Sequence, residues 1–98
     1  MKRSDVVTRL RDHAAELRAR GIVSVHLFGS TARDEAGPES DVDLFLDTDP
    51  NRKFSLIDLA DVGFLLEDLL GARVDVTTRD SLHPSLRAGI EAAAERVV

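Results

Sequence analysis

The stretch HLFGSTARDEAGPESDVDLFLD, residues 26–47, joins two predicted strands through a Gly-Ser turn. Residues 22–28 are β-branched and alternate in polarity, which predicts a strand that ends at Gly29-Ser30. Residues 31–36 can form a short helix, which Gly37-Pro38 would end. Residues 41–47 predict a second strand, in which apolar residues alternate with Asp41 and Asp43. The stretch therefore places two carboxylates on one face of a strand whose other face is apolar.

The remainder of the chain predicts helices that can cover such a sheet. Apolar residues at helical spacing predict a first helix over residues 4–21, with Ser4 as its N-cap. Ser55, supported by Asp58, is expected to cap a helix over residues 55–71. A third strand is predicted over residues 73–77, and a last helix is predicted from Pro84 to Val97. The predicted fold class is therefore α+β, with a small mixed β-sheet flanked by helices in a single domain over residues 1–98.

The third predicted strand carries a third candidate carboxylate. Its two valines share one face, and Asp75 points to the other face. If the apolar faces of the strands meet the helices, Asp41, Asp43 and Asp75 stand together on the open face. Two unit charges about 4 Å apart repel by roughly 4 kcal/mol at an effective dielectric of about 20, which a fold without a ligand would avoid. Carboxylate oxygens suit Mg²⁺, so these three aspartates are candidate metal ligands.

The Gly-Ser turn offers the complementary chemistry. Gly29 lets the backbone approach a ligand closely, and Ser30 stands at the start of a short helix, where free N–H groups attract anions. Arg33, one turn later, can add a positive charge. An Asp-x-Asp pair by itself is more often an exposed strand face, and the pair Asp47 and Asp49 is interpreted as a solvated strand end. The combination of the turn with the first pair favours a site for a metal-bound triphosphate.

The composition excludes several other kinds of site. The chain has no cysteine, and its three histidines, His13, His26 and His83, lack the spacing of metal ligands. The net charge is −5 and no basic stripe is interleaved with aromatic residues, so direct nucleic-acid binding is not expected. No apolar run is long enough to span a bilayer and the N-terminus lacks a secretory h-region, so a cytoplasmic protein without membrane contact is expected.

Gly29-Ser30, ten intervening residues and Asp41-Val42-Asp43 match the Gly-Ser-x10-Asp-x-Asp signature of the DNA polymerase β-like nucleotidyltransferase superfamily. Within it, LFGSTAR and SDVDLFLD most resemble the minimal nucleotidyltransferases (MNT), which include the MntA-type antitoxins of HEPN–MNT toxin–antitoxin pairs. The resemblance covers nearly the whole chain and implies the polymerase β-like nucleotidyltransferase core.

The resemblance also implies roles for individual residues. Asp41, Asp43 and Asp75 would bind two Mg²⁺ ions, and Asp75 would help to activate the attacking hydroxyl. Gly29 and Ser30 would contact the nucleotide phosphates. Arg33 is a further candidate for nucleotide binding, but two acids, Asp34 and Glu35, follow it directly. A structural salt bridge of Arg33 on the short helix is therefore an equally good interpretation.

The implied reaction is Mg²⁺-dependent transfer of AMP from ATP to a tyrosine hydroxyl of a cognate HEPN ribonuclease toxin, with release of pyrophosphate. The choice of adenine rests on the resemblance alone. Two alternatives stay open: an antitoxin that masks its partner without catalysis, and a subunit that transfers the nucleotide to a small-molecule hydroxyl. The intact carboxylates favour the enzyme, because a pure binding module has no need to tolerate their repulsion.

The predicted helix over residues 55–70 is apolar around most of its circumference, with a narrow stripe formed by Asp58, Asp61 and Asp68. A small sheet cannot cover so much apolar surface, and a large exposed apolar patch usually marks an interface. The helix is therefore a candidate surface for a HEPN toxin partner or a homodimer. Complete burial of the helix by flanking helices is an equally open alternative.

Overall fold

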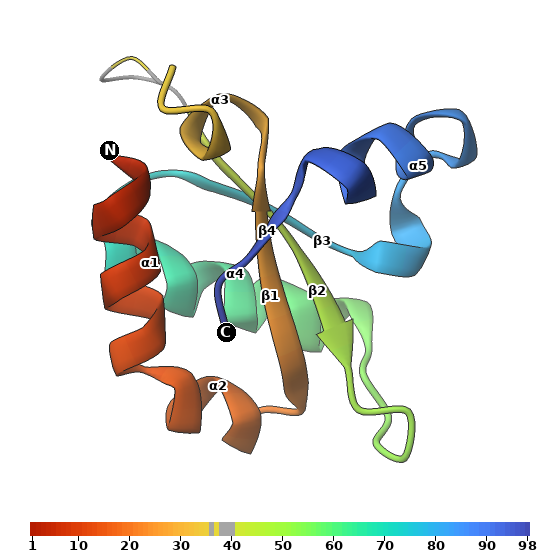
Figure 1. Cartoon of the computed structure of the whole chain (residues 1–98). Helices are drawn as coiled ribbons and strands as arrows, with labels where there is room; N and C mark the ends of the chain where they lie inside the picture. Colours follow the sequence, from red (N-terminus) through yellow and green to blue (C-terminus); the bar gives the residue numbers. More distant parts are fainter. Residues whose placement is uncertain (36, 38–40) are drawn as a thin grey trace.

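The computed structural model describes residues 1–35, 37 and 41–98 (Figure 1). One four-stranded sheet has the strand order β3-β2-β1-β4. β1 (Ile22–Phe28) pairs antiparallel with β2 (Val42–Thr48) and with β4 (Glu95–Arg96), whereas β2 pairs in parallel with β3 (Val74–Thr78). The fold is therefore α+β with a mixed sheet, as the sequence predicts. The predicted end of the short helix at Ala36 and Pro38 lies outside the described residues.

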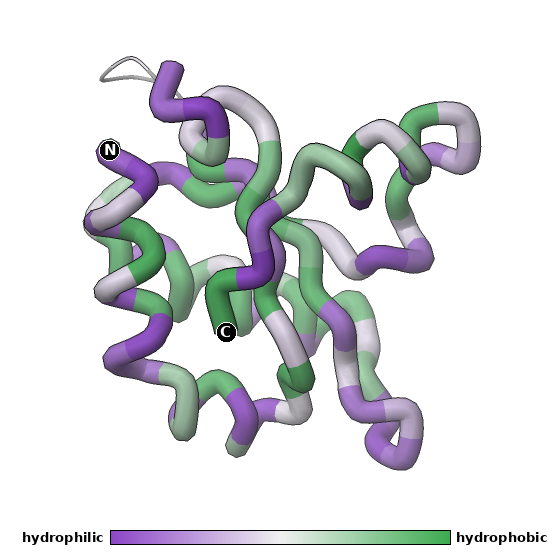
Figure 2. The backbone as a smooth tube through the Cα atoms, viewed as in Figure 1, coloured by the Kyte–Doolittle hydropathy of each residue, from purple (hydrophilic) through white to green (hydrophobic). Residues whose placement is uncertain are grey.

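Helices cover one face of this sheet and enclose the core. They are α1 (Arg3–Asp12), α2 (Ala14–Ala19) and α4 (Leu56–Leu70), while α3 (Gly29–Ala32), the 3₁₀ turn η1 (Arg79–Ser81) and α5 (Pro84–Ala93) flank the strands. In Figure 2 the hydrophobic segments gather on α4, β1 and β2. The buried cluster consists of Val6, Leu10, Leu17, Ile22, Val25, Leu27, Val42, Leu44, Leu46, Val62, Leu66, Leu70 and Val97. Alternate residues of β1 and β2 point away from this core, onto the opposite face of the sheet.

The start and end of α4 follow the capping pattern predicted from the sequence. The Ser55 hydroxyl accepts a hydrogen bond from the backbone N–H of Asp58 at 3.2 Å, and the Asp58 carboxylate accepts one from the backbone N–H of Ser55 at 2.8 Å. Gly71 ends the helix with φ of 63°, in the left-handed region that favours glycine. This helix connects the parallel strands β2 and β3, so it fixes their relative position.

Two features of the first predicted helix differ from the prediction. The first predicted helix is broken at His13, whose Nδ1 donates a hydrogen bond to the Arg9 carbonyl at 2.8 Å and so competes with the backbone for that acceptor. Its N-cap is Lys2, without a side-chain cap, so the prediction of Ser4 as the N-cap is wrong.

The last predicted helix ends early, because the chain after Ala93 pairs with the free edge of β1. Residues of β4 pair with His26 and Leu27, and Val97 donates its backbone N–H to the Val25 carbonyl at 2.8 Å. Val97 is therefore buried through strand pairing and not through a helical face. No helix in the described part of the chain is both long enough and apolar enough to cross a membrane.

Candidate active site

The second and third candidate carboxylates lie side by side in the sheet. Asp43 of β2 is the direct register partner of Asp75 of β3, and the flanking pairs are Val42 with Val74 and Leu44 with Val76. Since these flanking residues face α4 and the core, both aspartates point to the opposite, open face. Asp75 is exposed and Asp43 is half-buried. The parallel pairing thus brings together two acids that are far apart in the sequence.

Asp41 precedes β2 by one residue and is exposed. Its influence is visible at Asp43, where burial raises the pKa of the carboxyl group above its ordinary value and the negative charges of Asp75 and Asp41 raise it further. The positive charge of Arg33 acts in the opposite direction on the same pKa. The negative charges of the three acids therefore act on one another at the start of β2 and β3, and a bound cation would reduce this repulsion.

Gly29 contacts this carboxylate cluster through its backbone. It follows β1 with φ of +72°, and an added Cβ atom would collide with a carboxylate oxygen of Asp43 and lie 3.1 Å from the Asp43 Cγ. Both the backbone conformation and the space therefore require a residue without a side chain. The close approach of the Gly29 backbone to a ligand stays a prediction. Within the chain, the group that occupies the space of the missing Cβ atom is the side chain of Asp43.

Ser30 and Thr31 lie in the first turn of α3, directly beyond Gly29. Backbone N–H groups in the first turn of a helix lack partners within the helix, so they face outward as donors. Thr31, for which the sequence predicts no role, is 1% exposed, and its Oγ1 has no hydrogen-bond partner among the described residues. Such a buried, unpaired hydroxyl is rare in folded proteins. It adds one polar group to the turn beside Asp43.

Arg33 forms a salt bridge on the short helix, which is one of its two interpretations from the sequence, while its role in nucleotide binding stays a prediction. Its Nε donates to a carboxylate oxygen of Glu35 at 3.0 Å, and both side chains are exposed, so the pair is a surface salt bridge. Arg33 also lowers the pKa of Asp43, which places its charge within electrostatic reach of the cluster. A surface pair of this kind is weak, so separating Arg33 from Glu35 costs little free energy.

The donor set fits a divalent cation in chemistry and in charge. Carboxylate groups lie at the start of β2 and β3, and the pKa of Asp43 is raised first by burial and then by the negative charges of Asp75 and Asp41. Within residues 1–35, 37 and 41–98, no three His, Cys, Asp or Glu side chains are gathered closely enough to hold a metal ion by themselves. Mg²⁺ is commonly held by one or two carboxylates together with substrate phosphates, so a closed protein cage is not required.

An aromatic layer lies next to Asp43 on the open face of the sheet. The sequence did not predict this layer. Phe28 is the cross-strand partner of Asp43, and its ring lies 5.9 Å from that of Phe45. The ring of His26 stacks on that of Phe45, with the ring centres 4.5 Å apart and the planes inclined by 5°. The signal for this layer was the same period of two that places Asp43 and Phe45 on one face.

Asp47 belongs to an ion network and not to a solvated strand end, so that interpretation of the sequence is wrong. Arg79 donates to both of its carboxylate oxygens, at 2.8 and 2.9 Å, and Ser24 donates its hydroxyl at 2.8 Å. These contacts, that of Arg79 first, hold the pKa of Asp47 well below its ordinary value. Arg79 also forms a salt bridge with the Glu91 carboxylate of α5 at 2.6 Å, and its guanidinium carbon lies 4.8 Å from the centre of the Phe45 ring.

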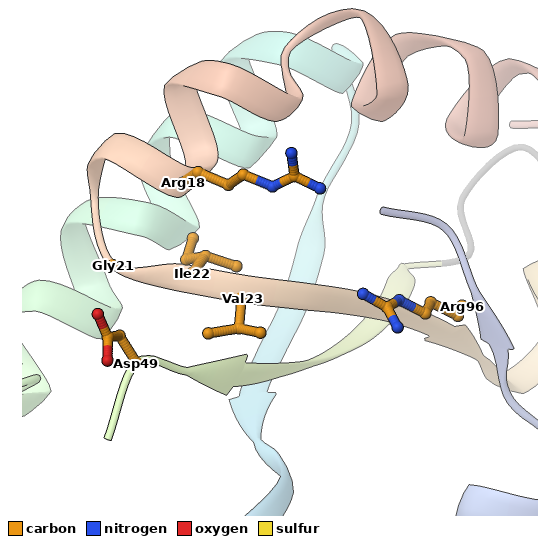
Figure 3. Close-up of a pocket in the computed structure, with 6 residues that line it drawn as sticks. All are labelled: Arg18, Gly21, Ile22, Val23, Asp49 and Arg96. Atoms are coloured by element: carbon orange, nitrogen blue, oxygen red, sulfur yellow. The ribbon is translucent and has the colours of Figure 1, made fainter. Parts of the chain in front are cut away.

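A pocket of about 380 Å³ lies at the other end of the sheet (Figure 3). It is lined by Arg18, Gly21, Ile22, Val23, Asp49 and Arg96. Ile22 pairs with Thr48 at this end of the two central strands, whereas Phe28 pairs with Asp43 at the carboxylate end. The pocket is therefore separate from the candidate active site.

Similarity to known proteins extends over most of the chain. The nucleotidyltransferase domain family matches residues 7–97. A relative in Thermococcus cleftensis, named protein adenylyltransferase MntA, is 38% identical over 83 residues, which span 84% of this chain and 82% of that protein.

Two solved structures are also similar. One, described as a candidate minimal nucleotidyltransferase, superposes with a TM-score of 0.81 at 35% identity. The superposition covers 97% of this chain and 95% of that chain. A toxin–antitoxin crystal structure with AMP-PNP gives a TM-score of 0.70 over 100% of this chain and 73% of that one, but at 17% identity this likeness concerns the fold alone. The chain therefore belongs to the nucleotidyltransferase domain family, as a minimal nucleotidyltransferase of the protein adenylyltransferase type.

Proposed function

We propose that this protein is an antitoxin that transfers AMP from ATP to a tyrosine hydroxyl of a HEPN-type toxin, with Mg²⁺ as the cofactor. The observation that carries the proposal is the pairing of Asp43 with Asp75 in adjacent strands on the open face. Gly29 lies beside them, where the Asp43 carboxylate leaves no room for a Cβ atom. The name of the Thermococcus cleftensis relative and the toxin–antitoxin neighbour support the choice of a protein acceptor.

Each group of the site has a defined task in this reaction. The first-turn N–H groups at Gly29 and Ser30 hold the phosphates of ATP, and Arg33 adds a positive charge once it leaves Glu35. Asp75, which is exposed, accepts the proton of the acceptor hydroxyl. The hydroxyl oxygen then forms a bond to the α-phosphorus of ATP, and the bond from that phosphorus to the bridging oxygen breaks. Pyrophosphate leaves, and AMP stays on the acceptor.

Asp41, Asp43 and Asp75 would hold Mg²⁺ in this site, where the ion would neutralise charge that develops on the attacking and leaving oxygens. The half-buried position of Asp43 keeps its carboxylate fixed between β1 and β3, with Gly29 packed against it. Asp41 and Asp75 are more exposed, so they can adjust to the substrate.

A non-catalytic antitoxin that masks its partner is the second candidate, and one observation favours it. Three large apolar side chains of α4, those of Leu56, Ile57 and Phe64, are exposed on the outside of the protein. A surface of this kind suits a lasting complex. The two candidates differ in one measurable property, because masking does not depend on the carboxylates.

The test is transfer of labelled AMP from ATP, with Mg²⁺, to the product of the neighbouring gene, read as an increase in intact mass. We expect Asp43→Asn and Asp75→Asn each to slow transfer by about 10²–10³-fold, the usual effect of removing one group that stabilises the transition state. Asp12→Asn, an exposed acid at the end of α1, is the matched control and should leave transfer unchanged. Normal transfer by the Asp43→Asn protein would remove Asp43 from the site.

A further inference from the structure

α4 presents an apolar stripe to the outside of the protein. Leu56, Ile57 and Phe64 are 84%, 75% and 67% exposed, and they are three of the five large hydrophobic residues that are exposed in the described part of the chain. Ile57 and Phe64 are separated by two helical turns, with exposed Ala60 between them, so they lie on one side of the helix. We call Leu56, Ile57, Ala60 and Phe64 the α4 stripe. The flanking helices therefore leave this side of α4 uncovered.

Acidic residues flank the α4 stripe and have no partner of opposite charge within the described structure. Asp61 and Asp68 are exposed and lie on the same side of the helix as Ile57 and Phe64. In residues 1–35, 37 and 41–98 neither of them forms an ion pair, and α4 itself contains no basic residue. The surface thus combines large apolar side chains with unpaired negative charge.

The charge decides which kind of chain can cover this surface. In a symmetric dimer the same patch meets itself, so Asp61 and Asp68 would approach the same two acids of a second copy. Like charges brought together at an interface oppose association, whereas basic residues opposite them would favour it. We propose that the α4 stripe docks a different protein, whose matching surface is an apolar helix face flanked by Lys and Arg residues.

The docking surface and the candidate active site lie on opposite sides of the sheet. The inner side of α4 packs on β3, where an added Cβ at Gly63 would lie 3.3 Å from Val76. Val76 and Asp75 are neighbours in the strand and point to opposite faces. A partner that covers the α4 stripe therefore leaves the carboxylates accessible. This inference rests on the proposed function in one respect. The acceptor hydroxyl must reach the carboxylates from the open face of the sheet, which the docked partner leaves uncovered.

The test uses two labelled amphipathic helical peptides that share a leucine face, one flanked by lysines and one by glutamates. Fluorescence anisotropy should show binding of the lysine peptide and at least tenfold weaker binding of the glutamate peptide. Phe64→Ser and the pair Asp61→Asn with Asp68→Asn should each weaken binding of the lysine peptide at least tenfold. Leu86→Ser is the matched control, because Leu86 is a 59% exposed leucine on α5, and it should leave binding unchanged.

Two outcomes would overturn the proposal. Absence of lysine-peptide binding, or binding that Phe64→Ser does not weaken, would show that the α4 stripe is not the docking surface. Sedimentation of the protein as a dimer that Phe64→Ser dissociates would assign the stripe to a second copy. Failure of this proposal can be distinguished from failure of the proposed function by the rise in Tm that ATP and Mg²⁺ should cause. The Phe64→Ser protein should retain that rise whether or not the peptide binds.

Discussion

Gly29 and Asp43 are in contact, so the backbone turn and the carboxylate depend on each other. The positive φ of Gly29 aims the chain from β1 into α3, and the absence of a Cβ atom leaves room for the Asp43 side chain. Asp43 in turn carries a raised pKa, caused first by burial and then by Asp75 and Asp41. The residue at position 29 therefore controls both the path of the chain and the position of the acid.

We expect Gly29→Ala to lower the free energy of unfolding by about 1–2 kcal/mol, since a residue with a side chain is strained at positive φ. It should also slow AMP transfer, because the added Cβ displaces the Asp43 carboxylate. Urea denaturation and the transfer assay measure the two effects. Gly89→Ala is the matched control, since nothing lies within 4 Å of a Cβ at that position of α5. A helix interior favours alanine over glycine by about 1 kcal/mol, so this control should be stabilised.

Among the elements, α5 depends most on charged contacts. None of its residues is buried, and Arg79 links it to the sheet by bonding Glu91 at 2.6 Å and Asp47 at 2.8 Å. Arg87 adds a bond to the other oxygen of Glu91 at 2.7 Å. A ten-residue helix has little stability by itself in water, so this network and the pairing of β4 with β1 hold α5 in place.

Arg79→Met should lower the free energy of unfolding at neutral pH by about 1–2 kcal/mol, after allowance for solvent screening of partly exposed charges. Arg79 holds the pKa of Asp47 below 3.8, its value in an unfolded chain. The stability that this pair adds is therefore fully present above that pH and is lost as the pH falls below it. Urea denaturation from pH 7 down to pH 2 should show the difference between the two proteins shrinking below pH 3.8. Arg20→Met, at an exposed arginine without an ion pair in the described structure, serves as the control.

The sequence predicted the elements with local signals and missed those that depend on distant pairing. Alternation placed Asp43 and Asp75 on the open face, and the capping pattern of Ser55 fixed the start of α4, because both follow from short-range periodicity. β4 was missed since its two residues pair only where β1 offers a free edge. The partner of Asp47 was missed for a similar reason, because Arg79 reaches it only after β3 has docked beside β2.

At the scale of the whole molecule, the chain is small and acidic, with 98 residues and a net charge of −5. A domain of this size has a modest core, so a bound ligand makes a large difference to its stability. The carboxylates at the start of β2 and β3 add repulsion that no arginine in the described structure neutralises by an ion pair. Ligands that bring positive charge to this place should therefore stabilise the fold.

We expect Mg²⁺ with ATP at about 100 times the dissociation constant to add about 2.7 kcal/mol to the free energy of unfolding. For a domain of about 100 residues this corresponds to a rise in Tm of roughly 10–20 °C. Differential scanning fluorimetry measures the shift, and EDTA should reverse most of it. Asp43→Asn should show a much smaller shift with the same ligands. An equal shift in the presence of EDTA would mean that the nucleotide binds without the ion.

The parallel pairing of β2 with β3 makes the candidate site complete only late in protein synthesis. Asp41 and Asp43 leave the ribosome first, and Asp75 follows only after the whole of α4 has been made. A nascent or truncated chain that ends within α4 thus carries two of the three acids, and under the proposed function we expect it not to modify another protein. Under the proposed function, catalytic competence would require a complete fold, and a fragment released too early would leave other hydroxyl groups in the cell unmodified.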